Sequence, residues 1–183
     1  HFNLEKKLIK LLMEKILLVP HPKLRQKAEN IEKVTEDEIN ISKRMTEIMK
    51  NAPGVGLAAN QIGILKKIIV VHIKDEDKNV DKIYSLFNPK IKFYSKETVI
   101  LEEGCLSFPQ QFAEIERPSS IVVQYINEKN DLIDVQKDGY EARILQHEID
   151  HLSGKLFVDY LSSLKRNIII KKVKKLIKSG DVE

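Results

Sequence analysis

Gln146-His147-Glu148-Ile149-Asp150-His151 carries the pattern H-E-x-x-H inside a helical run. Residues four apart on an α-helix lie one turn above each other on the same face. His147 and His151 can therefore direct two imidazoles at one metal ion. Glu148, the next residue around the helix, can reach a water on that ion without being a ligand. Two ordinary helical histidines would also fit this pattern, so other segments must decide.

The sequence downstream of this motif offers no convincing third ligand. A metzincin peptidase would place a histidine six residues after His151, but Phe157 stands there and cannot bind a metal. A thermolysin-like enzyme would place a glutamate further along a helix. The acidic residues after His151 are Asp159, Asp181 and Glu183, none of which is a glutamate at a suitable helical position.

Upstream, the single cysteine, Cys105, is the best candidate for the third ligand. A lone cysteine cannot form an internal disulfide, and it fits a reducing, intracellular setting. The alternative is a small buried hydrophobic residue, a common fate of a free cysteine. Gly104 allows close approach of backbone, and the charged Glu102 and Glu103 make a poor core flank. One cysteine and two histidines leave a tetrahedral ion one open position, which is typical of a catalytic site.

A third segment, Gly54-Val55-Gly56-Leu57-Ala58-Ala59-Asn60-Gln61, is small and apolar and ends in a polar amide. Its glycines suggest a dinucleotide-binding loop, but such a loop must follow a strand and open a helix. Here the segment follows a helical run from Glu38 to Met49, and Pro53 precedes it. The dinucleotide interpretation is therefore rejected.

Together, the three segments resemble the peptide deformylase family, which carries G-x-G-x-A-A-x-Q, E-G-C-L-S and Q-H-E-x-D-H in this order. They stand here at 54–61, 103–107 and 146–151. The resemblance is closest to the bacterial-type branch, and it implies a catalytic domain at 16–183 preceded by an extension at 1–15.

The resemblance implies a metal-dependent hydrolase that removes the formyl group from N-formylmethionine of nascent polypeptides. The expected partners are N-formylmethionyl peptides and, where these chains emerge, the ribosome. Cys105 as thiolate and His147 and His151 as neutral imidazoles would bind one divalent ion. Fe(II) is the expected ion in the cell, with Zn, Co or Ni accepted in preparations. A water whose pKa the ion lowers to about 7 would attack the formyl carbon, with Glu148 as general acid and base.

The family's donors for the developing negative charge map to the side-chain amide of Gln61 and the backbone N–H of Leu106. Two residues depart from the pattern of many relatives, namely Asn60 in place of threonine and Phe112 in place of arginine. These two departures leave the peptide preference open, but they do not affect the expected metal chemistry. The candidates for substrate binding, by position, are Val55, Gly56, Gly104 and Ile144.

Several alternatives remain open at this point. Glu103 and Arg117 either form a supporting ion pair or stay two solvated charges. A zinc metallopeptidase of the H-E-x-x-H class is the alternative enzyme, although Phe157 and the missing downstream carboxylate disfavour it. A binding module with structural zinc would need a fourth protein ligand. The remaining histidines are His1, His21 and His72, and we expect His72 to be an ordinary strand residue.

Length and composition indicate one soluble globular domain of 183 residues. There is no apolar run long enough to span a membrane. The net charge of +4 comes from widely spread lysines, so we expect no direct nucleic-acid binding. The chain starts at His1, and residues 4–18 carry apolar side chains at helical spacing up to Pro20 and Pro22. Residues 1–15 fit either the remainder of a presequence or a natural extension. With this leader, we favour a bacterial-derived organelle of a eukaryote, plastid or mitochondrion, over bacterial cytoplasm.

The predicted fold is a single α+β domain in which antiparallel strands surround a central metal-binding helix. Thr35 and Glu38 form a capping-box signal for a helix that runs to about Met49. The metal helix is predicted at 139–152, with Asp138 as N-cap and Gly154 near its end. Strands are predicted at 67–73, 83–87, 120–126 and 132–135, with a charged loop at 75–81 and with Asn88-Pro89 ending the second strand.

A C-terminal amphipathic helix is predicted at 164–178, with Ser162 or Ser163 as its cap. Seven lysines or arginines lie among its apolar residues. A basic helix of this kind can bind a membrane surface or a ribosome. We favour the simpler alternative, in which the helix docks on the body of the protein by an apolar stripe. The apolar residues in question are Ile168, Ile169, Val173, Leu176 and Ile177.

Overall fold

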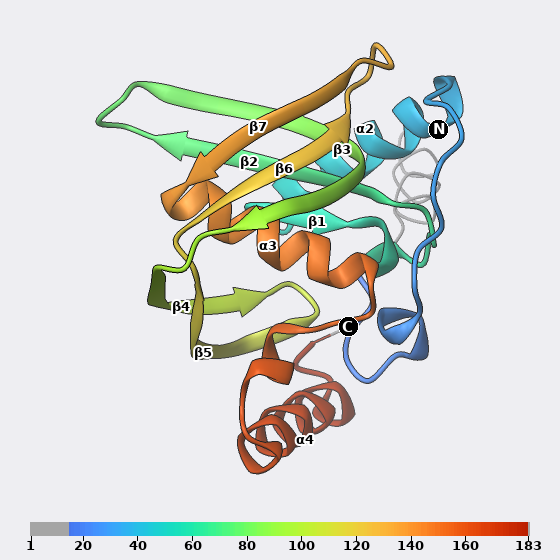
Figure 1. Ribbon diagram of the computed structural model, residues 1–183. Coiled ribbons are helices and arrows are strands. Elements are labelled where there is room, and N and C mark those ends of the chain that lie inside the picture. The colour runs from blue at the N-terminus through green and yellow to red at the C-terminus, as the bar shows by residue number, and fades with distance from the viewer. Residues whose placement is uncertain (1–14, 183) are drawn as a thin grey trace, which may run out of the picture.

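The computed structural model describes residues 15–182 and places helix α3 between two antiparallel sheets (Figure 1). The larger sheet has the strand order β1-β2-β3-β6-β7, and the smaller one is the hairpin β4-β5. The predicted α+β domain with a central helix is therefore confirmed. The elements are β1 Gly56–Ala58, β2 Ile68–Asp75, β3 Val80–Tyr94, β4 Thr98–Cys105, β5 Phe108–Pro118, β6 Ser120–Ile126, β7 Leu132–Asp138 and α3 Gly139–Leu152.

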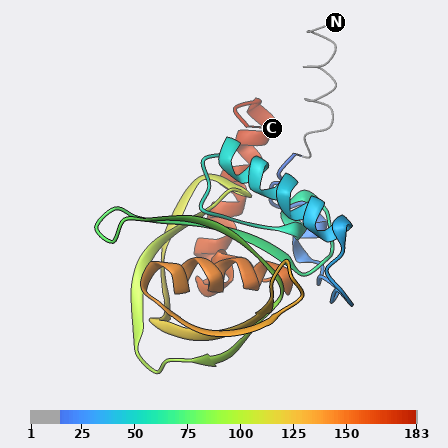
Figure 2. The same ribbon diagram turned by 90° about the horizontal axis from the view of Figure 1, so that it is seen from above.

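The larger sheet is covered on both faces, by α3 on one side and by α2, Glu36–Asn51, on the other (Figure 2). Strand β2 alternates between the two cores, as the two-residue period of a strand requires. Ile69 and Val71 pack with the α3 side, whereas Ile68 and Val70 pack with α2. Burial on both faces explains why β2 reads as a continuous apolar run. This packing fixes the position of α3 relative to β1.

Helix α2 begins as predicted, with Thr35 at its N-cap. The Glu38 carboxylate accepts a hydrogen bond from the Thr35 backbone N–H at 2.9 Å and one from Lys66 at 3.0 Å. Hydrogen bonds from the side chain and the backbone of Thr35, together with that from Lys66, outweigh burial and lower the pKa of Glu38 to about 2.

We expect Glu38→Gln to lower the free energy of unfolding by about 1 kcal/mol at pH 7, as loss of a helix cap typically does. Because the folded-state pKa is depressed, this contribution is complete above the unfolded value of 4.5 and disappears as pH falls towards 2. Urea unfolding of both proteins at several pH values measures it. A difference that stays constant down to pH 2 would contradict the assignment.

Two details of the predicted strands were wrong. Asn88-Pro89 does not end a strand, because β3 continues to Tyr94 with a register shift between Phe87 and Lys90. Proline lacks an N–H and is tolerated at such a bulge. The backbone of Asn88 has a φ of 49°. Its side chain accepts from the backbone N–H of Ile31 at 2.8 Å and donates to the Ile31 carbonyl at 2.7 Å. The predicted loop at 75–81 is shorter, since Asp75 ends β2 and Val80 begins β3.

The metal helix and the C-terminal helix have the predicted limits. α3 spans 139–152, although Asp138, which precedes it, makes no side-chain cap hydrogen bond. α4, Ser163–Ser179, is capped by the Ser162 hydroxyl, which accepts from the Lys165 N–H at 3.3 Å.

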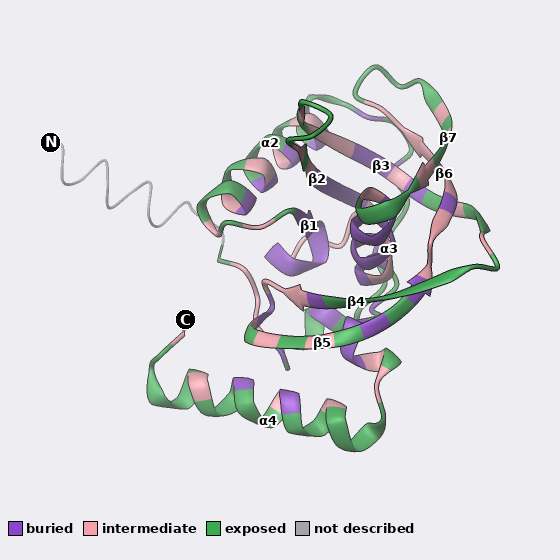
Figure 3. Cartoon of the chain, turned by 90° about the vertical axis from the view of Figure 1, so that its left-hand side faces the viewer, coloured by how far each residue is buried: buried purple, intermediate pink, exposed green. Residues whose placement is uncertain are grey.

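Helix α4 docks on the smaller sheet by a narrower stripe than predicted, and most of its surface is exposed (Figure 3). Only Ile169 and Val173 are buried in the described part of α4, while Ile168 and Ile177 face solvent. Before α4, the short helix η3, Phe157–Tyr160, packs against β5 and α4.

Within residues 15–182, none of the helices has the length and apolar character that crossing a bilayer requires. The apolar pattern at 4–18 lies mostly outside the described residues, and 15–18 carry no regular secondary structure. Two further short helices, η1 Pro22–Arg25 and η2 Ala59–Ile62, flank the core.

Candidate metal centre and active site

Cys105, His147 and His151 come together as predicted. Cys105 ends β4, while the two histidines lie one turn apart on α3, so the sheet and the helix each supply part of the site. One ligand atom from each residue lies within 4.8 Å of the other two. The Cys105 Sγ is 3.4 Å from the His151 Nε2, and both histidines are buried. A soft thiolate and two imidazoles converging at this spacing suit a tetrahedral transition-metal ion with one open position.

The ring of His147 is oriented from behind by Glu103. Its Nδ1 lies 2.9 Å from the Glu103 Oε1, which directs the other ring nitrogen towards the ligand cluster. A carboxylate behind a metal-binding histidine fixes its tautomer and its orientation. Burial would lower the pKa of His147, but hydrogen bonds with Cys105 and Glu103 outweigh it and raise that pKa. Burial lowers the pKa of His151 well below its usual range, which keeps this ring neutral.

The Glu103 carboxylate is held by two arginines. Of the two alternatives left open for Glu103 and Arg117, the ion pair is the one that forms, and it is buried. Arg117 donates from Nε at 2.6 Å and from a terminal nitrogen at 3.0 Å, and Arg143 donates at 2.5 Å. Burial alone would raise the pKa of Glu103, but the hydrogen bonds from His147 and Arg117 lower it to about 2. Glu103 therefore remains a carboxylate and an acceptor for the His147 ring.

Glu148 lies beside the ligand cluster in a buried position. Its Oε2 has no hydrogen-bond partner among the described residues, an unusual state for a buried polar atom. Burial raises the pKa of Glu148 to about 7. A bound cation would attract the charged form and lower that value again. A carboxyl group poised near neutral pH, with one oxygen free, suits proton transfer to or from a bound molecule.

The absence of a side chain at Gly56 makes room for Glu148. A Cβ at this position would lie 2.6 Å from the Glu148 Oε1 and 2.8 Å from its Cγ. A larger residue at this position would therefore force the Glu148 side chain to shift. The glycine therefore fixes where the carboxylate sits.

We expect Gly56→Ala to lower kcat by about 100-fold, because displacing a reacting group by about 1 Å can cost that much. The fold and the metal content should be unchanged, since Gly56 does not have a positive φ and does not ligate. Steady-state kinetics, with metal analysis and a thermal melt as controls, test this. Undiminished turnover would show that the position of Glu148 is not critical.

Gln61 presents its amide nitrogen to the cluster. The Ala58 N–H donates to its Oε1 at 3.0 Å, so the Nε2 group is directed the other way. That group donates to the Ser107 Oγ at 3.1 Å and lies 3.5 Å from the Cys105 Sγ. The donor is thus oriented by backbone before any ligand binds, as charge stabilisation requires. Leu106 lies next to Cys105 and lines the same cavity.

A cavity of about 440 Å³ opens over the cluster. Val55, Gly56 and Gly104 line it, together with His147 and Glu148. The fourth predicted substrate residue, Ile144, lines a small adjoining cavity of about 70 Å³, which Val55 and Gly104 also border. The predicted substrate residues therefore line two cavities that share Val55 and Gly104.

Sequence reasoning missed Tyr140 and Arg143 at the site. Tyr140 lines the main cavity, as does Phe112, which the sequence had marked as a departure from the family pattern and which is 64% exposed. Arg143 lies four residues before His147, the same spacing that joins the two histidines, so an arginine on this helical face was a usable signal.

Asn60 is buried behind the site and donates to the Gln26 carbonyl at 2.8 Å. His72 pairs with Asp81 on the hairpin of β2 and β3 and takes no part in the cluster, as expected.

The α+β fold thus brings together three residues that could hold a metal ion, Cys105, His147 and His151, beside the buried carboxyl group of Glu148. The sequence profile of the family described as polypeptide deformylase matches residues 13–167. The chain is 42% identical over 168 residues to the peptide deformylase of Phenylobacterium zucineum, covering 92% of this chain and 99% of that protein. It is 47% identical over 167 residues to that of Pelagibacter ubique, covering 90% and 95%.

Among solved structures, the peptide deformylase of Ehrlichia chaffeensis superposes with a TM-score of 0.87 at 39% identity, covering 92% of this chain and 98% of that one. The chain belongs to the peptide deformylase family, whose members are metal-dependent hydrolases that remove the formyl group from nascent polypeptides. This assignment replaces the alternative of a zinc metallopeptidase.

Proposed function

We propose that Cys105, His147 and His151 hold one divalent metal ion, which serves to deformylate N-formylmethionyl peptides. The observation that carries this proposal is the convergence of the three ligand atoms within 4.8 Å, beside the free carboxylate oxygen of Glu148. When bound, the ion supplies Lewis-acid chemistry, which polarises a carbonyl group and lowers the pKa of water.

The residues around the cluster transfer the proton and stabilise the developing negative charge. Glu148 accepts the proton of the attacking water and returns it to the leaving amine. The Gln61 Nε2 group and the backbone N–H of Leu106 donate to the formyl oxygen as it gains negative charge. Removing one donor of this kind typically lowers the rate by about 100-fold or more.

Shape selects the substrate. A formyl carbon bears hydrogen where an ordinary peptide carbonyl bears a chain, and Glu148 packs so closely against Gly56 that little space remains there. The methionine side chain enters the small cavity bordered by Val55, Gly104 and Ile144. The peptide backbone pairs with the exposed backbone near Val55 and Gly104, a strand addition that tolerates varied downstream sequence.

Fe(II) is the ion we propose for the working enzyme, since a thiolate and two imidazoles accept Fe(II), Co(II), Ni(II) or Zn(II) and discriminate weakly. An accessible Fe(II)-thiolate centre is oxygen-sensitive. We expect activity to fall during aerobic purification and to be preserved when Co(II) or Ni(II) replaces the native metal. Assay of anaerobic, aerobic and metal-exchanged preparations measures this. Equal activity of freshly isolated and zinc-loaded protein in air would contradict the choice of iron.

The cellular setting is also a proposal. The relatives described above are bacterial. We keep the prediction of a bacterial-derived organelle, with bacterial cytoplasm as the alternative, and the division into an extension at 1–15 and a catalytic domain at 16–183. The exposed, lysine-rich face of α4 suits a polyanionic surface such as the ribosome, where nascent chains emerge.

The function is tested with a matched pair of peptides, formyl-Met-Ala-Ser and acetyl-Met-Ala-Ser, on protein of measured metal content. We expect one metal ion per chain, rapid release of formate from the first peptide, and at least 100-fold slower cleavage of the second. The two peptides differ by one methyl group, so this difference measures how well the site excludes a larger acyl group. Equal cleavage of both, or cleavage of internal peptide bonds, would overturn the proposal.

A further inference from the structure

A second polar cluster lies behind the metal ligands and has no part in the mechanism above. The Tyr160 hydroxyl donates to the Asp150 Oδ2 at 2.7 Å and accepts from a terminal nitrogen of Arg117 at 3.1 Å. The same Arg117 nitrogen donates to the Asp150 Oδ2 at 2.8 Å. These three groups form a closed triangle of hydrogen bonds between η3, α3 and β5.

This triangle connects directly to a metal ligand. The other side of the Arg117 guanidinium donates twice to Glu103, and Glu103 accepts from the Nδ1 of His147. Arg117 is 2% exposed, Glu103 6% and His147 7%, so water does not compete for these bonds. The guanidinium is planar and rigid, and fixing one of its edges therefore fixes the other.

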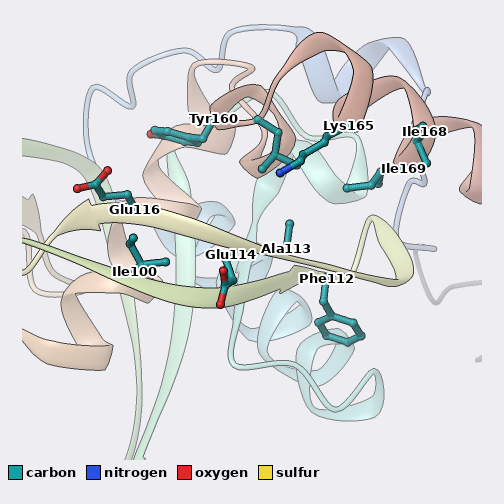
Figure 4. A pocket seen from close by; sticks show the side chains of 10 residues that line it. Ile100, Phe112, Ala113, Glu114, Glu116, Tyr160, Lys165, Ile168 and Ile169 are labelled. Carbon is teal, nitrogen blue, oxygen red and sulfur yellow. The ribbon is translucent and has the colours of Figure 1, made fainter.

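The ring of Tyr160 is itself held in place. Two cations contact it, with the Lys155 Nζ 3.9 Å and the Arg117 Cζ 4.6 Å from its centroid. Figure 4 shows it at one end of the groove of about 520 Å³ between the β4-β5 hairpin and α4. The first residue of η3, Phe157, packs almost parallel to the His147 ring, with centroids 6.0 Å apart at 29°. The η3 segment thus reaches His147 both by contact and through hydrogen bonds.

We propose that Tyr160 is a positioning residue for the metal ligand His147 and that it acts through Arg117 and Glu103. This inference rests on the proposed role of His147 as a ligand. Without the hydroxyl, Arg117 loses one of its two partners at the outer edge, and Asp150 loses a donor. The guanidinium then holds Glu103 less firmly, and the His147 ring is less well oriented when a metal binds.

The test is Tyr160→Phe, which removes the hydroxyl and keeps the ring and its two cations. The matched control is Tyr84→Phe. The hydroxyl of Tyr84, on β3, donates at 2.7 Å to Glu141, which lies in the first turn of α3, whereas His147 and His151 lie in the second half of that helix. Metal-free protein is titrated with Co(II), and the dissociation constant is read from the absorption of the complex. We expect about a threefold to tenfold weaker affinity for Tyr160→Phe, below the roughly 10–100-fold cost of losing a ligand's direct partner. Tyr84→Phe should bind as wild type does.

Two further variants test whether Tyr160 acts on His147 through Arg117 and Glu103. Asp150→Asn should weaken Co(II) binding in the same direction, and in a Glu103→Gln background Tyr160→Phe should add no further loss. Wild-type affinity in Tyr160→Phe, an equal loss in Tyr84→Phe, or additive losses with Glu103→Gln would overturn the inference while leaving the metal centre intact. Failure of the wild-type protein to bind Co(II) would instead reject the metal centre itself, and this inference with it.

Discussion

Glu148→Ala should retain its metal ion and lose nearly all turnover, with kcat lower by about 1000-fold, within the range that general acid–base groups contribute. The reason is geometric, because the carboxylate has a free oxygen beside the ligand cluster but is not one of the three converging ligands. Metal content per chain and the rate of formate release from formyl-Met-Ala-Ser, measured on the same preparation, separate the two roles.

Glu148→Gln is the matched control, since it keeps the size of the side chain and removes the basic oxygen. Both variants should be equally inactive and equally loaded. Loss of metal from either variant would show that Glu148 is a ligand. Turnover near that of wild type in the glutamine variant would show that this carboxylate transfers no proton.

Cys105→Ser should bind metal much more weakly, by more than the roughly 10–100-fold that follows loss of an outer partner of a ligand. A neutral hydroxyl is a poor replacement for a thiolate. Activity at low metal concentration should fall accordingly, and the thermal stability of the metal-free protein should change little, because a free cysteine contributes modest packing.

Cys105→Asp is the informative companion to this variant, because a carboxylate can ligate. We expect it to bind metal more tightly than Cys105→Ser but to remain a poor catalyst, since the charge and polarity around the ion are altered. Metal affinity equal to wild type in Cys105→Ser would remove Cys105 from the ligand set.

The metal helix was the most predictable part of the molecule. Its signal is local, since the four-residue spacing of His147 and His151 and the flanking Gly139 and Gly154 define a face and two ends. The α4 helix was predictable for the same reason. Its docking stripe is narrower than the sequence indicated, because only the face that packs against Phe157 and Ile115 is buried.

The β4-β5 hairpin, which carries Cys105 and Glu103, was not predicted as strands. The outer part of β4 faces solvent on both sides, so Val99, Ile100 and Leu101 do not alternate with polar residues as a half-buried strand would. Its pairing with β5 joins residues that no local pattern connects. The same holds for Tyr160, because its contact with Arg117 depends on how η3 folds back.

The sharpest test of the metal centre is the absorption spectrum of metal-free wild-type protein titrated with Co(II). We expect one equivalent of Co(II) to bind, with an intense near-ultraviolet band from charge transfer between the Cys105 thiolate and the metal, and no such band in Cys105→Ser. A one-to-one wild-type complex that lacks this band would contradict the Cys105-His147-His151 centre on which the proposed mechanism depends.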